Sequence, residues 1–292
     1  MKRFLSFLLL PLASLLSCRA QTPRQPAETK SLLWKISGKG LSQPSYLFGT
    51  IHLICPGDYL WTDAMQRSLA ACKQVCLELD MDDPKTLSSA SEGLMNTGEK
   101  KLKDYFTPAQ YARLEQFAKD TLHTSLAPLQ MLKPIALESV MLSKIAGCMI
   151  PVSYEANIME KAHQAKQEVI GLEEVKEQVD AIASLPDDTT VSMVMKMTDS
   201  LSASQRDYAK MVQAYVKQDL PELYRQIAES GELGDDGTGA LLTDRNARWI
   251  PRIERIVKGK PTFFAVGAGH LWGDAGVITL LRRAGYTVEA VK

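Results

Sequence analysis

One short pattern closes two predicted strands that lie near opposite ends of this chain. Residues 45–53 read SYLFGTIHL and residues 261–273 read PTFFAVGAGHLWG, so each run of strand-forming residues stops at a Gly-x-x-His-Leu. In open α/β sheets ligands gather at the carboxyl ends of the strands. We therefore expect His52 and His270 to form one site, which requires the two ends of the chain to fold together.

Strands are predicted at both ends of the chain, and helices fill the middle. The short apolar runs that predict strands cover 33–36, 46–51, 74–80, 168–172, 262–266 and 286–291. Helical spacing covers 61–73, most of 84–165, 190–229, 243–257 and 274–284. This order predicts an α/β (α+β) fold: a mixed β-sheet built from the N- and C-terminal segments, with a large central helical insertion.

Several helix starts carry local signals. Thr107 followed by Pro108 is typical of an N-cap and first helical position, Ser153 is a possible cap, and Thr62 or Asp63 could cap the helix at 61–73. The segment 128–147 is almost wholly apolar, which predicts a buried helix that bends or restarts at Pro134. The stretch GELGDDGTG at 231–239 predicts a loop.

The first residues predict export. Residues 1–18 have a basic start and an apolar stretch too short for a comfortable membrane span, which is typical of a signal peptide. Leu15-Leu16-Ser17-Cys18 also resembles a bacterial lipobox, which predicts lipid attachment at Cys18; cleavage after Ala20 is the alternative. We expect residues 19–32 to be a polar tether, residues 33–292 to be the folded domain, and the protein to reside in the cell envelope or periplasm.

Charge and cysteine content set further limits. Lys plus Arg equals Asp plus Glu at 34 each, so no basic excess indicates a nucleic-acid partner. Export permits disulfides, but Cys55, Cys72, Cys76 and Cys148 allow three complete pairings and the sequence does not choose among them. No Cys-x-x-Cys pair is present, which disfavours a cysteine-based zinc or redox site.

The two histidines are suited to metal binding or proton transfer. Imidazole is the commonest protein metal ligand and titrates near neutral pH. Gly49 and Gly267 precede His52 and His270 by three residues, and we expect their backbone freedom to let the chain turn sharply where each strand ends. A single histidine after a strand is more often a loop or core residue, but the repeated context favours a function for this pair.

Acidic and basic residues near other strand ends complete the candidate set. Glu78 lies in the apolar run CLELD, where a carboxylate is costly unless it is paired or bound to a cation. Glu173 follows the strand-like VIGL, although an acid in the first turn of a helix is favourable anyway. Arg245 and Asn246 open a helix whose arginines form a stripe, which is usually a solvated face; Arg245 could instead hold a carboxylate or an anionic substrate group.

These motifs together resemble the TraB/PrgY/GumN family, which is related in pattern to the TIKI metalloproteases. The matching segments are YLFGTIHL at 46–53, VCLELD at 75–80, VIGLEEVKEQ at 169–178, DRNARW at 244–249 and the run at 266–291, all in the expected order. The resemblance implies a divalent-metal site with His52, His270 and Glu78 as ligands and Glu78, Glu173 and Arg245 as catalytic residues. It also implies supporting roles for Gly49, Gly267, Asn246 and Glu155.

The resemblance therefore implies a metal-dependent, peptidase-like hydrolase that acts on a peptide or small molecule. A mixed nitrogen and oxygen ligand set fits Zn, Mn or Co, and the sequence does not choose among them. The chain has no His-Glu-x-x-His motif, so it is not an ordinary zincin, and it has no Gly-x-Ser-x-Gly motif, which disfavours a serine hydrolase. The alternative is a non-catalytic envelope protein that binds a peptide or a small ligand, including haem. In either case we expect contact with the membrane only through a lipid on Cys18.

Overall fold

A computed structural model describes residues 30–229 and 239–292. The predicted signal peptide, Cys18, most of the tether and the loop at 231–238 lie outside the described residues. Among the residues that are described, no helix combines the length and the apolar character needed to cross a membrane.

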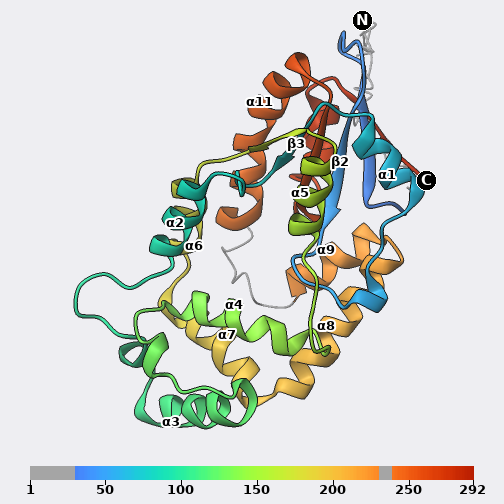
Figure 1. Cartoon of the computed structure of the whole chain (residues 1–292). Coiled ribbons are helices and arrows are strands. Elements are labelled where there is room, and N and C mark those ends of the chain that lie inside the picture. The colour runs from blue at the N-terminus through green and yellow to red at the C-terminus, as the bar shows by residue number, and fades with distance from the viewer. Residues whose placement is uncertain (1–29, 230–238) are drawn as a thin grey trace, which may run out of the picture.

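A six-stranded mixed sheet forms the centre of the fold (Figure 1). The strand order is β4-β3-β5-β2-β1-β6, and β1 runs antiparallel to both of its neighbours whereas the other neighbouring pairs are parallel. The strands are β1 (Leu33–Ser37), β2 (Ser45–Thr50), β3 (Gln74–Leu77), β4 (Glu168–Gly171), β5 (Thr262–Gly267) and β6 (Thr287–Ala290). The sheet therefore joins the two ends of the chain, as predicted.

The pairing of β2 with β5 brings the two repeated motifs side by side. Thr50 is the register partner of Gly267, so His52 and His270 follow neighbouring strands at the same edge of the sheet. Strand β3 pairs with both β4 and β5, which brings the chain after Leu77 and after Gly171 to that edge as well. Parallel pairing thus collects four strand ends in one place.

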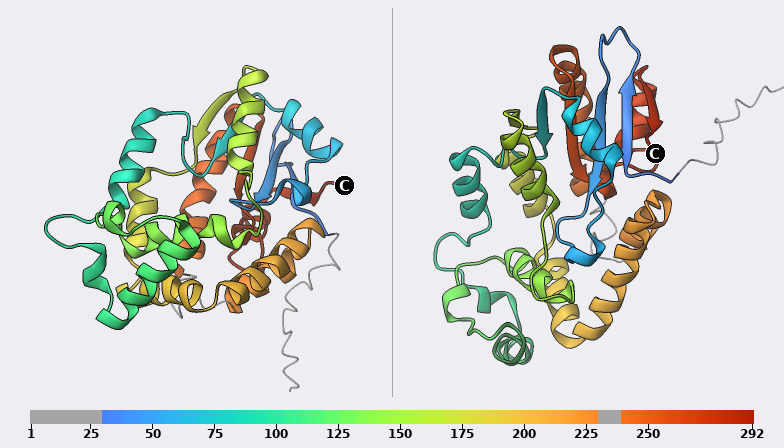
Figure 2. Two further views of the ribbon diagram at one scale, coloured as in Figure 1. Left: turned by 60° about the horizontal axis from the view of Figure 1, so that its bottom comes forward. Right: turned by 45° about the vertical axis from the view of Figure 1, so that its right-hand side comes forward.

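Helices cover both faces of the sheet. Helices α1 (Asp63–Ala70) and α5 (Tyr154–Gln164) lie on one face, and α11 (Asp244–Gly259) and α12 (Val277–Arg283) lie on the other (Figures 1 and 2). Helices α2 (Pro84–Gly93) and α6 (Val175–Ala183) pack against each other beside β4. The predicted α/β fold class is confirmed, because helices cover both faces of a mixed sheet.

The central insertion forms a second, helical part below the carboxyl edge of the sheet (Figure 1). It contains α3 (Pro108–Phe117), α4 (Pro134–Ile145) and α7 (Asp187–Asp199), which share a hydrophobic core of their own. Helices α8 (Leu201–Val216) and α9 (Leu220–Glu229) lead from this part back to the sheet. Among the described residues, the short 3-10 helices are Pro56–Asp58, Leu102–Tyr105, Ala127–Leu129 and Ala268–His270, and the short π-helices are Ala118–Leu122 and Gly239–Thr243.

The predicted helix caps are present. Thr62, Thr107 and Ser153 each accept a hydrogen bond from the backbone N–H three residues later, so each satisfies a donor that the first helical turn leaves free. Helix α4 begins at Pro134, where the sequence predicted a bend or restart. This helix is not buried all round, because Val140 remains 43% exposed.

Two predicted segments have different boundaries in the structure. Strand β3 ends at Leu77 instead of continuing to Asp80, because the backbone after Leu77 turns to accept hydrogen bonds from Leu172 and Glu173 beyond β4. The helical stretch predicted for 190–229 is three helices, α7, α8 and α9, with turns at Ser200 and Gln218.

The structure shows which of the four cysteines at 55, 72, 76 and 148 form a disulfide. Cys55 is bonded to Cys148 with an S–S distance of 2.12 Å, and Cys72 and Cys76 are buried thiols. Beside the disulfide, Ile54 and Val152 exchange two backbone hydrogen bonds. The segment after His52 is therefore tied to the segment that enters α5.

Candidate active site

A buried cluster centred on Arg245 lies where β3, β4 and β5 end. Arg245 projects from the first turn of α11 and is only 6% exposed. Its Nη2 donates to Glu78 Oε2 at 2.6 Å and to Glu173 Oε1 at 2.6 Å, and its Nε donates to Glu173 at 3.1 Å. Its Nη1 lies 3.1 Å from Leu241 O and 3.1 Å from His270 Nε2. All five donors of the guanidinium therefore have partners.

The tautomer of His270 follows from its two neighbours. An arginine N–H can only donate, so His270 Nε2 must accept from Arg245. The other ring nitrogen, Nδ1, lies 2.7 Å from Asn246 Oδ1 and therefore carries the proton. The Asn246 amide is oriented by its own Nδ2, which donates to the carbonyl oxygens of His270 and Ala275. Burial lowers the pKa of His270 to about 3, so this imidazole is neutral at pH 7.

The carboxylate of Glu78 joins the ends of β3 and β5 to helix α11. Its Oε1 accepts from the Gly267 backbone N–H at 2.8 Å, and its Oε2 accepts from Arg245. Burial acts to raise its pKa, but its interactions with His270, Arg245, His52 and the Gly267 N–H outweigh burial and lower the pKa to about 2. Glu78 is thus a largely buried, ionised carboxylate, as expected for an acid that is paired with a cation.

Two residues of this cluster were not predicted from the sequence. Trp249 donates its indole N–H to Glu173 Oε2 at 2.9 Å, and its ring packs on His270 with 4.4 Å between ring centroids. Gln178 donates to both Glu78 and Glu173. Trp249 lies four residues after Arg245 on the same helix, and that spacing would have placed the two side chains on one face.

His52 belongs to a separate, more open pair. Its Nδ1 lies 3.5 Å from Glu155 Oε1, and its side chain is 73% exposed. Glu155 itself accepts from Thr50 Oγ1 at 2.7 Å and from Ser153 Oγ at 3.0 Å, so its carboxylate is oriented by a strand end and a helix cap. The contact with Glu155 raises the pKa of His52 to about 9, and the charge of Glu78 adds to this effect.

The structure does not require the backbone freedom of glycine at Gly49 or Gly267. Neither residue has a positive φ, so the expected sharp turn is not what requires glycine there. A Cβ on Gly49 would lie 3.1 Å from both Ala268 Cα and Leu271 Cδ2, and a Cβ on Gly267 would lie 3.4 Å from Glu78 Oε1. The absent side chain of Gly49 lets β2 approach the turn after β5, whereas a Cβ on Gly267 would make only ordinary van der Waals contact with Glu78.

Whether these residues suit a divalent metal can be judged from their donor atoms. The Nδ1 atoms of His52 and His270 each face an oxygen acceptor, Glu155 and Asn246 respectively, which is how metal-binding histidines are commonly oriented. Two carboxylates face one guanidinium in the buried cluster, so that cluster carries one excess negative charge. Donor type and orientation therefore fit a metal such as Zn, Mn or Co.

In the structure, Glu78 and His270 are arranged around the Arg245 guanidinium and not around a metal ion. Within residues 30–229 and 239–292, no group of three His, Cys, Asp or Glu side chains is placed to hold a metal ion. Arg245 occupies the lone pair of His270 Nε2 and one oxygen of Glu78. A cation bound by His52, Glu78 and His270 would have to share or displace these Arg245 contacts.

Comparison with known proteins identifies the family. A model of the TraB/PrgY/gumN family matches residues 32–290, which include both repeated motifs and every residue of the Arg245 cluster. The chain belongs to the TraB/PrgY/gumN family. No solved structure matches it significantly.

Several curated proteins resemble this TraB/PrgY/gumN chain at low identity. It is 27% identical to Metalloprotease TIKI1 of Danio rerio over 93% of this chain and 65% of that protein. It is 25% identical to Metalloprotease TIKI1 of Homo sapiens over 91% of this chain and 63% of that protein. Metalloprotease TIKI homolog of Nematostella vectensis is 25% identical, over 94% of this chain and 69% of that protein. The chain thus spans about two-thirds of the length of the curated relatives it matches.

Proposed function

We propose that this TraB/PrgY/gumN protein is a metal-dependent hydrolase that cleaves peptide bonds at the carboxyl edge of its sheet. The observation that carries the proposal is the matched orientation of His52 and His270, each with Nδ1 facing an oxygen acceptor. The names of the TIKI relatives supply the reaction class.

Each residue of the site has a role that follows from its contacts. His52, Glu78 and His270 would hold the cation, which supplies Lewis acidity to polarise a peptide carbonyl. Asn246 fixes the tautomer of His270. Glu155 orients His52 and lies at the exposed side of the site, where a carboxylate can accept a proton from a reacting group.

Arg245 and Glu173 differ in access to a substrate. The side chain of Glu173 has no exposed surface, and its carboxylate is held by Arg245 and Trp249, so we assign it to positioning Arg245. Arg245 contacts two of the three proposed metal ligands, Glu78 and His270, and would stabilise negative charge that develops beside them.

The proposal includes export to the cell envelope and lipid attachment at Cys18, which rest on the sequence of residues 1–18. Substituting Cys18→Ser in the full chain should release the protein from the membrane fraction of the producing cells. Membrane association that survives this change would contradict lipid attachment.

Metal content and peptide cleavage test the hydrolase proposal together. We expect the purified protein, reconstituted with Zn, Mn or Co, to retain about one metal ion per chain. His52→Ala and His270→Ala should each lower metal affinity at least tenfold and abolish cleavage of a peptide library, since each removes a ligand. His163→Ala is the matched control, because His163 is a half-exposed histidine paired with Asp82 outside the cluster.

The possible outcomes separate the parts of the proposal. Equal, near-zero metal in the wild type and both variants would refute the metal site. Retained metal without cleavage would refute the peptidase and leave a binding protein. An absorption band near the Soret region after addition of haem would point to the haem-binding alternative instead.

A further inference from the structure

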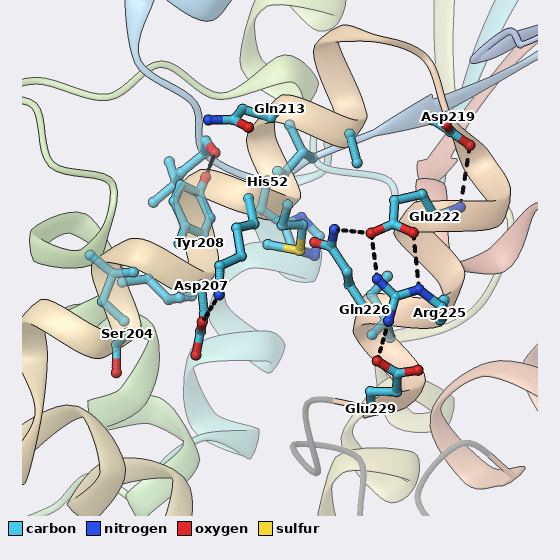
Figure 3. Close-up of a pocket in the computed structure, with 18 of the residues that line it drawn as sticks. His52, Ser204, Asp207, Tyr208, Gln213, Asp219, Glu222, Arg225, Gln226 and Glu229 are labelled. Atoms are coloured by element: carbon cyan, nitrogen blue, oxygen red, sulfur yellow. Dashed lines mark hydrogen bonds and ion pairs between the residues drawn. The ribbon is translucent and has the colours of Figure 1, made fainter.

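A large cavity lies beside the candidate active site, between the sheet and the helical part. Its volume is about 840 Å³, which is in the range that holds a drug-sized ligand or several residues of a peptide. The chain just after β2 forms one wall, and helices α4, α7, α8 and α9 form the others. Figure 3 shows His52 between the side chains of α8, such as Tyr208, and those of α9, such as Arg225.

The cavity adjoins the site without containing its buried cluster. His52 lines the cavity, whereas Arg245, Glu78 and His270 do not. A ligand that reaches His52 from this side would therefore leave a flanking portion inside the cavity. Tyr208 fixes the wall at this point, since its hydroxyl donates to the carbonyl of Leu53.

One part of the wall is apolar and rich in methionine. The apolar side chains come from the segment after β2 and from α4, α7 and α8: Leu53, Leu142, Ile145, Met193, Met197 and Met211. Unbranched thioethers adapt to side chains of different shape, and methionines are frequent on surfaces that bind varied apolar ligands. This wall is chemically suited to a large apolar group.

The charged part of the wall is balanced, and most of its charges are paired with one another. Apart from His52, five acidic and five basic side chains line the cavity. Arg225 bonds both Glu222 and Glu229, and Lys30 and Lys210 pair with Asp219 and Asp207. Because these charges compensate one another, the wall away from His52 offers little net attraction to a ligand of either sign. Burial of apolar surface is then the main source of selectivity.

We propose that this cavity is a substrate subsite that takes a large apolar side chain, such as Leu, Met or Phe, of the residue next to the bond presented to His52. The inference rests on the proposed peptidase function and names its substrate class: peptides with a large apolar residue beside the scissile bond. Uncharged small residues and charged residues at that position bind more weakly.

Peptide binding tests this subsite independently of cleavage. The probes are matched fluorescent peptides that differ at one residue, which is Leu, Phe, Ser, Glu or Lys. Binding is measured by anisotropy with a chelator present, so that the affinities do not depend on turnover. We expect the Leu and Phe peptides to bind about tenfold more tightly, or better, than the Ser, Glu and Lys peptides. The double change Met193→Gln and Met211→Gln should remove most of that preference.

Two further variants complete the design. Met131→Gln is the matched control, because Met131 is a partly exposed methionine outside the cavity, and it should leave the preference unchanged. Met193→Trp should narrow the cavity and disfavour Phe more than Leu, which provides a second test if the double variant does not fold. Equal binding of all five peptides, no binding in the millimolar range, or a preference that survives in a folded double variant would overturn the subsite. The metal assay decides the hydrolase separately, so the two proposals can fail independently.

Discussion

At the scale of single residues, Arg245 is the side chain on which the buried cluster depends. It supplies the positive charge between Glu78 and Glu173 and a donor to His270. Buried ion pairs seldom add much net stability, but removing one partner leaves an uncompensated charge and is costly. The arginine is therefore structural even if it also contributes to catalysis.

Arg245→Met should lower the free energy of unfolding by about 3–5 kcal/mol at pH 7, since two carboxylates lose their counter-ion. Urea denaturation of the variant and the wild type measures the change. Arg248→Met is the control, because Arg248 is 41% exposed on the same helix and should change stability by less than about 1 kcal/mol. A difference between the two variants within error would refute the central role of Arg245.

At the scale of elements, the site depends on how closely β2 approaches the turn that follows β5. Gly49 lies at this contact, where a Cβ would meet Ala268 and Leu271. The same turn carries His270 and is joined to β3 through the bond from Gly267 to Glu78. Small changes in this packing will therefore displace His270.

Gly49→Ala should destabilise the protein by about 1–3 kcal/mol through overpacking, and should reduce metal affinity by moving His270. Gly57→Ala is matched to it, since a Cβ on Gly57 would meet nothing within 4 Å. Thermal unfolding of both variants decides the point. Indistinguishable melting temperatures would mean that the turn yields without cost.

A second element contact joins α6 to α11 through Glu177 and Arg252. Arg252 donates to both carboxylate oxygens, at 2.7 Å and 2.8 Å, and also to Leu172 O. This bonding is the main reason that the pKa of Glu177 is lowered from 4.5 to about 2. A lowered pKa in the folded state contributes stability above the unfolded value, and that contribution is lost as pH falls from 4.5 to 2.

Glu177→Gln should therefore reduce stability by about 1–2 kcal/mol at pH 7, allowing for partial solvent screening of the pair. The difference from wild type should shrink through the window from pH 4.5 to pH 2, which urea denaturation at several pH values would follow. Glu289→Gln, at an exposed acid of β6, is the matched control and should change stability at pH 7 by less than about 0.5 kcal/mol. A difference that stays constant with pH would contradict this assignment.

At the scale of the whole molecule, one disulfide fastens the helical part to the sheet. Cys55 follows β2 by a few residues and Cys148 follows α4, so the bond closes a loop with a sequence separation of 93 residues. It lies beside the backbone pairing of Ile54 with Val152, on the route from His52 to Glu155. The bond therefore stabilises the fold and holds the exposed half of the site together.

Replacing Cys55 and Cys148 with alanine should lower the free energy of unfolding by about 2–4 kcal/mol. The free thiols of Cys72 and Cys76 serve as a probe of unfolding, because both are buried and burial raises the pKa of Cys72 to about 12. They should resist alkylation until the protein unfolds. Wild-type stability in the double alanine variant would show that the backbone pairing alone is sufficient.

Local signals in the sequence determined the elements of this protein. The caps at Thr107 and Ser153 and the restart at Pro134 depend on neighbouring residues, so they can be predicted without tertiary contacts. The repeated Gly-x-x-His also placed His52 and His270 after strands. The extent of β3 was wrong, because its end is determined by hydrogen bonds from the chain beyond β4.

Only the tertiary structure decided the partners within the site. Spacing along the chain placed Glu78, Glu173 and Arg245 near strand and helix ends, but it contained no information on which charges would meet. The strand order places β5 between β3 and β2. This arrangement of segments that are distant in sequence brings Glu78 to Arg245. His52 pairs with Glu155 outside that cluster. The disulfide was undetermined for the same reason: pairing depends on distances in space, which the sequence of one chain does not record.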